Sequence, residues 1–148
     1  MLRSILIGVV AGQRAMTPLA VVTAAAAWNR LPNGGVRAMH PAVAPAAIAL
    51  AAGEMAGDKM RTAPDRTVLP GLLARATTAA IAGAALAPAG RRRLGGMLAM
   101  TAAVASSYAG LALRRRLMQR SGQAATGFVE DALVLTAGVA IATAGNRG

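Results

Sequence analysis

Five long runs of small apolar residues make up most of this chain and restrict it to few folds. They are rich in Ala, Leu, Val and Ile and cover residues 2–27, 41–57, 68–87, 94–113 and 124–144. Only 14% of the residues are charged, against roughly 25% in soluble domains. About 20 apolar residues suffice to cross a bilayer as a helix. We therefore predict an all-α, polytopic transmembrane helical bundle, one membrane-embedded domain over residues 1–148. A soluble Ala-rich bundle is the alternative, because alanine is only weakly hydrophobic.

The first apolar run is interrupted by polar residues and a proline. Gln13 and Arg14 lie at its centre, and Pro18 removes a backbone hydrogen bond shortly afterwards. This pattern predicts a membrane helix that is kinked or broken near residues 14–18. Gly8 and Gly12 are four residues apart, a spacing that lets a neighbouring helix approach closely.

The second run, residues 41–57, is short for a full crossing, and Pro45 weakens its first turn. It either spans the bilayer at a tilt or re-enters on the same side. Gly53 and Gly57 are expected to admit a neighbouring backbone beside its acidic face. Further along the chain, residues 88–90 are expected to end the third run, and residues 119–123 to form a loop before the fifth.

The net charge of +11 is placed at the ends of the apolar runs. Arg91–Arg93 and Arg114–Arg116 flank the fourth run without interleaved aromatic residues, which favours a lipid bilayer with anionic headgroups over nucleic acid as the partner. The cations divide almost evenly between the two expected sides, which gives a weak bias towards a cytoplasmic N-terminus and also fits a dual-topology homodimer. Small-residue helices in so short a chain predict a homo-oligomer.

The chain has five acidic residues, and they fall in two groups. Glu54 and Asp58 are four residues apart, so both carboxylates share one helical face, and Glu130 and Asp131 are adjacent. Charged groups within a membrane pair with one another or line a wet cavity. The candidate polar site comprises Arg14, Thr17, Glu54, Asp58, Lys59, Asp65, Arg66, Arg75, Tyr108, Glu130 and Asp131.

Three functions are compatible with these residues. In the first, a small transporter or channel, the carboxylates bind a divalent or monovalent cation or relay protons. In the second, a membrane enzyme, Mg²⁺ on the carboxylates and nearby cations act on a lipid phosphate. In the third, a structural or accessory subunit, the charges are ion pairs near helix ends. No cofactor is required by any motif, catalytic residues are not assigned, and the metal-ligand candidates are Glu54, Asp58, Glu130 and Asp131.

Several segments together resemble a known family. They are residues 12–18 (GQRAMTP), 53–59 (GEMAGDK), 64–67 (PDRT), 70–76 (PGLLARA), 108–110 (YAG) with Arg114 and Arg115, and 130–132 (EDA). The chain resembles the domain-of-unknown-function family numbered four-one-two-six, which consists of small bacterial integral membrane proteins. The resemblance covers nearly the whole chain and implies a multi-pass protein of the bacterial inner membrane. It implies no activity. Gln13 departs from the family pattern, where an apolar residue is expected.

Overall fold

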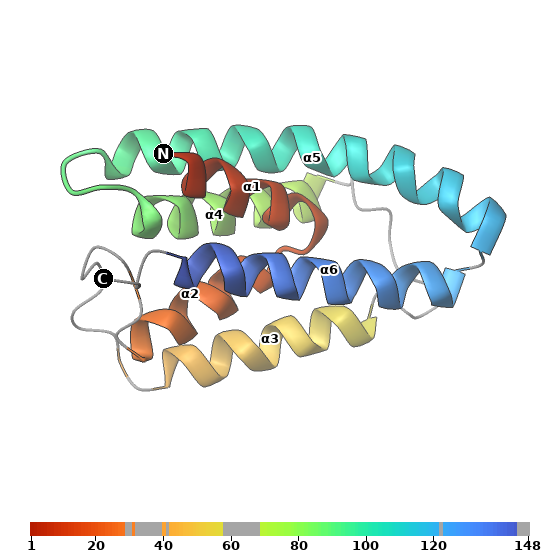
Figure 1. The fold of residues 1–148 in the computed structure, drawn as a ribbon, viewed down its shortest axis with the longest axis horizontal. Helices are drawn as coiled ribbons and strands as arrows, with labels where there is room; N and C mark the ends of the chain where they lie inside the picture. Colours follow the sequence, from red (N-terminus) through yellow and green to blue (C-terminus); the bar gives the residue numbers. More distant parts are fainter. Residues whose placement is uncertain (29–30, 32–39, 41, 58–68, 122, 145–148) are drawn as a thin grey trace.

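The computed structural model describes residues 1–28, 31, 40, 42–57, 69–121 and 123–144 (Figure 1). These residues form helices and turns, and no strand occurs among them. The predicted all-α class is confirmed. The helices are α1 (Leu2–Gln13), α2 (Thr17–Ala27), α3 (Val43–Gly57), α4 (Leu69–Leu86), α5 (Arg92–Ser121) and α6 (Gln123–Thr143).

The first apolar run forms two helices, because α1 ends at Gln13 and α2 begins at Thr17. The predicted break is confirmed, and Pro18 lies in the first turn of α2, where the missing N–H costs no helical hydrogen bond. We call residues 14–16 the break.

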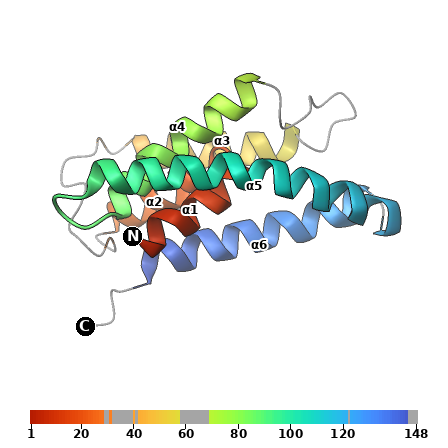
Figure 2. The same ribbon diagram turned by 90° about the horizontal axis from the view of Figure 1, so that it is seen from above.

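The chain reverses direction at the break, so α1 and α2 form a helical hairpin (Figures 1 and 2). A Cβ added to Gly138 of α6 would lie 3.4 Å from Val21 and 3.7 Å from Val10. Val10 and Val21 therefore lie side by side on α6, although eleven positions separate them in the sequence. Of the two predicted alternatives, a kink or a break, the structure has the break, and residues 14–16 turn the chain back instead of bending it.

Helix α1 packs closely against α5 through its glycines. A Cβ on Gly8 would lie 2.8 Å from the Cα of Ala99, and one on Gly12 would lie 2.5 Å from the carbonyl oxygen of Ala103. Real Cβ atoms do not approach backbone atoms this closely, so only glycine fits. The predicted close packing at these two glycines is confirmed.

Helices α4 and α5 form an antiparallel pair joined by the predicted turn at residues 88–90. Gly90 has a φ of 81°, which glycine adopts without strain. Helix α5 continues to Ser121, and α6 begins at Gln123. The loop predicted at residues 119–123 is therefore wrong for most of its length, since a polar sequence can continue a helix when no Pro or Gly ends it.

Helix α3 packs mainly on α2, through Ala47 and Ala51 of α3 and Ala20 of α2. Gly53 and Gly57 have no atoms within 4 Å of an added Cβ. Among the described residues, no backbone makes the predicted close approach to these glycines, because the alanine face of α3 makes the contact with α2 instead.

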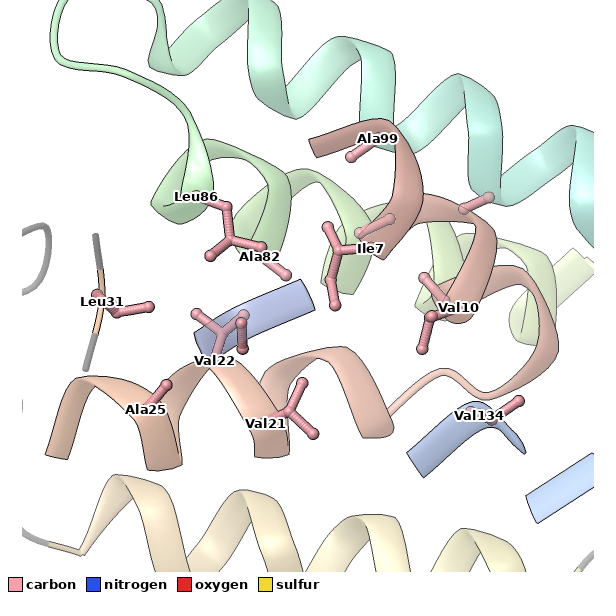
Figure 3. Packing of buried hydrophobic residues seen from close by; sticks show 14 residues of the cluster. Ile7, Val10, Val21, Val22, Ala25, Leu31, Ala82, Leu86, Ala99 and Val134 are labelled. Carbon is pink, nitrogen blue, oxygen red and sulfur yellow. The ribbon is translucent and has the colours of Figure 1, made fainter. Parts of the chain in front are cut away.

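The core contains few large side chains. Ile7 and Val10 of α1 point into the space bounded by Val21, Val22 and Leu86 (Figure 3), and most other core members are alanines. The largest fully buried side chains include Arg14, Thr17, Ser4 and Ser107. Large apolar residues of α1, α3, α4, α5 and α6, and Trp28 directly after α2, are exposed instead. They include Leu2, Trp28, Leu50, Leu73, Ile81, Met97, Leu113, Phe128 and Leu133.

Two of the described helices are long and apolar enough to cross a bilayer, namely Leu69–Leu86 and Arg92–Leu113. Helices α1, α2 and α3 are apolar but shorter, at 12, 11 and 15 residues. The structure therefore has six helices in place of about five apolar segments, and two of them meet the length and composition of a membrane crossing.

Gly8→Ala is expected to destabilise the fold by about 1–3 kcal/mol, because the new methyl group overlaps the Ala99 backbone. The matched control is Gly53→Ala, which places the same methyl group in open space and gains up to about 1 kcal/mol of helix propensity. Thermal unfolding of the purified variants, followed by circular dichroism, checks both. Equal unfolding temperatures would contradict the packing of α1 on α5.

Candidate functional site

Buried polar side chains gather around the break between α1 and α2. Those from Arg14, Thr17, Arg75, Ser107 and Asp131 are buried, and Glu54 is partly buried. They come from α2, α3, α4, α5, α6 and the break itself. We call these six residues the polar layer. Two of them are cations and two are anions, so their formal charges cancel, as a low-dielectric interior requires.

Arg14 forms an ion pair with Asp131 of α6. The Arg14 side chain is only 1% exposed, and that of Asp131 is 10% exposed. A lone charge buried to this extent would be strongly unfavourable, whereas a hydrogen-bonded pair is tolerated. Arg14 extends from the break because no helix continues through it, and this places its guanidinium against α6.

Glu54 of α3 binds the backbone of the break with both carboxylate oxygens. Oε1 accepts from the N–H of Ala15 at 2.7 Å, and Oε2 accepts from the N–H of Met16 at 2.8 Å. These N–H groups precede the first turn of α2, where backbone donors have no helical partner and the helix dipole favours an anion. The side chain of Glu54 therefore caps α2 from another helix.

Thr17, the first residue of α2, is fully buried. In the described part of the chain its hydroxyl has no hydrogen-bond partner. Most buried hydroxyls are hydrogen-bonded, so Thr17 leaves one buried donor unsatisfied at this end of α2.

Two contacts between α1 and α5 complete this level of the bundle. Ser107 donates a hydrogen bond to the carbonyl oxygen of Gly12 at 3.1 Å. Gln13 donates to the carbonyl oxygen of Ser106 at 2.9 Å and lies over Gly110. Gln13 thus binds one of the carbonyls of α5.

The register of α1 and α4 places Arg75 at the same level. Ser4 donates a hydrogen bond to the carbonyl oxygen of Gly83 at 2.9 Å. The two helices are antiparallel. Counting eight residues forward from Ser4 on α1 gives Gly12, and counting eight residues back from Gly83 on α4 gives Arg75, so these two positions lie at the same level. Arg75 is 5% exposed, so its charge lies inside the bundle as part of the polar layer.

The structure brings some predicted site residues together and separates others. Arg14, Thr17, Glu54 and Asp131 meet at the break, whereas Tyr108 is 54% exposed and lies outside the polar layer, since the serine before it occupies the buried face of α5. Glu130 follows Phe128 and Val129 on α6 and is partly exposed. The predicted residues Asp58, Lys59, Asp65 and Arg66 lie outside the described residues.

The carboxylates of the described residues do not gather into a metal site. No group of three or more His, Cys, Asp or Glu side chains occurs in that part of the chain. Glu54 contacts backbone donors and Asp131 contacts a guanidinium. Of the metal candidates, Glu54, Glu130 and Asp131 therefore form no shared cation site, and Asp58 is not described.

Sequence reasoning missed the role of the backbone amides and of two serines. Ser4 and Ser107 are fully buried and bind carbonyls of neighbouring helices. The available signal was spacing, because Ser4, Gly8 and Gly12 are each four residues apart and share one face of α1. The binding of Glu54 to the amides of residues 15 and 16 had no such signal.

Comparison of the chain with protein-family models, curated proteins and solved structures finds no match. The geometry of the polar layer is therefore the basis for any functional assignment.

The ion pair between Arg14 and Asp131 predicts how the stabilities of two single variants and their double variant compare. Asp131→Leu removes the carboxylate from buried Arg14 and is expected to cost about 3–5 kcal/mol, as is Arg14→Met. The double variant is expected to cost less than either single variant, because no buried charge loses its partner. Thermal unfolding of the three variants checks this. Costs that simply add would show that the two side chains do not depend on each other.

Proposed function

We propose that the protein is an integral membrane protein. The side-chain distribution supports this, because charged and hydroxyl groups are buried while large apolar groups face outward. In the two helices long enough to cross a bilayer, α4 and α5, only 33% and 22% of the residues in the apolar 18-residue stretch are buried. The core helix of a soluble protein would be mostly buried. Outward-facing Leu, Ile, Val and Met side chains need hydrocarbon around them, and a bilayer supplies it.

We propose further that the hairpin of α1 and α2 enters the bilayer without crossing it. Its helices are about 18 and 17 Å long at 1.5 Å per residue, whereas the hydrocarbon core is about 30 Å thick. The first apolar run, and not the second, is then the re-entrant one. Non-helical backbone at membrane depth is tolerated only where protein or water satisfies its polar groups, and Glu54 does so at the break.

The function that this arrangement supports best is transport of a small ion. Re-entrant or broken helices that meet buried charges are the usual form of a transport site, because helix termini there present backbone groups to the ion. Ionisable residues within a membrane mark ion pathways by default. The single observation that carries the proposal is the broken helix, with Glu54 on its amides and the Arg14–Asp131 pair beside it.

One observation favours a second candidate, a structural or accessory subunit. The carboxylates of Glu54 and Asp131 both bind partners within the chain, as they would in a protein that only needs its hairpin held in place. The lipid-phosphate enzyme lacks comparable support, since the described carboxylates form no group that would bind Mg²⁺.

The family resemblance leads us to propose that the membrane in which the protein lies is the bacterial inner membrane. Exposed Arg91, Arg92 and Arg93 at the start of α5 are placed to contact anionic headgroups at the surface. The homo-oligomer stays a prediction.

The re-entrant hairpin can be tested by labelling, because the chain has no cysteine. Single cysteines at Leu2, Trp28 and Ala89 are expected to react with a membrane-impermeant maleimide from the same side of the membrane. A cysteine at Arg116, beyond the apolar part of α5, is the control and is expected to react from the other side. Labelling of Leu2 and Trp28 from opposite sides would show that residues 2–27 cross the bilayer.

Transport is tested in vesicles that contain the purified protein. The wild type is expected to conduct at least one of K⁺, Na⁺, chloride or acetate faster than protein-free vesicles, measured by light scattering after an osmotic step. Asp131→Asn is expected to lower that flux at least tenfold, because Arg14 loses its charged partner, while Gly53→Ala leaves it unchanged. Wild-type flux equal to that of protein-free vesicles for every ion would favour the structural subunit.

A further inference from the structure

The amides that Glu54 binds form a site whose shape matches a carboxylate. Two neighbouring N–H groups each bind one oxygen of the same group, at 2.7 and 2.8 Å. This two-point geometry suits the planar, two-oxygen carboxylate better than a spherical halide, because each N–H points to its own oxygen. The chain's own side chain thus shows what class of ligand fits.

Thr17 supplies an independent sign that the site takes a ligand. Its hydroxyl is fully buried at the same end of α2 and has no partner in the described part of the chain, while both Glu54 oxygens are used by Ala15 and Met16. A hydroxyl at a helix N-terminus is a natural donor to an anion bound there.

Among the described residues, the helix that holds Glu54 on this site packs mainly on one neighbour. Helix α3 packs mainly on α2 and does so through small alanine side chains. Gly53 and Gly57, on either side of Glu54, contact nothing within 4 Å of an added Cβ. The end of α3 can therefore move away from the break without opening a large cavity in the core.

We propose that the start of α2, with the amides of Ala15 and Met16 and the hydroxyl of Thr17, is a binding site for a small monocarboxylate, and that Glu54 occupies it as a tethered competitor. This inference rests on the proposed function in that it names the substrate class of the same site. Exchange of one carboxylate for another keeps the charge beside the Arg14–Asp131 pair constant.

Acetate binding to the purified protein tests the site directly, with the ¹⁵N amide resonances of Ala15 and Met16 as the readout. Glu54→Ala is expected to bind acetate at least tenfold more tightly than the wild type, since the competitor is gone. In the Glu54→Ala background, Thr17→Val is expected to weaken binding about tenfold, and Thr17→Ser to retain it.

Several results would overturn the proposal. One is a folded Glu54→Ala protein whose two resonances do not respond to acetate, and another is a response equal to that of the wild type. Should Glu54→Ala not fold, the wild type and Glu54→Gln decide, and absence of acetate binding in both overturns the site. Failure of the transport proposal can be distinguished from failure of the binding site. If acetate binds to the protein but does not cross the vesicle membrane, the transport function is wrong and the binding site stands.

Discussion

The structure depends on how the backbone is satisfied where α1 stops and α2 begins. A chain reversal inside an apolar bundle exposes N–H groups that no helix can bond, and each would be costly without a partner. Glu54 supplies two acceptor oxygens to this point from α3. The hairpin, the position of α3 and the burial of Arg14 all follow from that one contact, since without it the break would have to be hydrated or helical.

The second requirement is close packing without large side chains. Gly8 and Gly12 of α1 let its backbone rest on that of α5, and Ser4 and Ser107 bind carbonyls across the helix pairs. In the bilayer that we propose for this protein, the surroundings are as apolar as the side chains, so helices gain little from burying leucine and gain from close backbone contact. This accounts for a core that is mostly alanine with few larger members such as Ile7 and Leu86, while many leucine, isoleucine and methionine side chains are exposed.

The polar layer joins these two features into one site. Arg14 and Asp131 neutralise each other, Glu54 caps α2, and the buried hydroxyl of Thr17 at the start of α2 has no partner among the described residues. A site of this kind has both a fixed part, the hairpin packed on α5, and a part with fewer contacts, the end of α3. That contrast is what a binding site needs if an internal carboxylate is to give way to an external one.

The sequence by itself determined the helical class, the position of the break and the glycine contacts at Gly8 and Gly12, because these depend on local composition, on Pro18 and on a four-residue spacing. It also identified Arg14, Glu54 and Asp131 as charges that must find partners. The tertiary structure alone decided that the chain turns back at residues 14–16, that Asp131 contacts Arg14, and that Glu54 binds amides in place of a cation. The physical reason is that partners 38 and 117 positions apart are chosen by how the helices pack, and local sequence carries no record of that choice. The same holds for Gly53 and Gly57, whose spacing matches that of the α1 glycines although no helix lies against them.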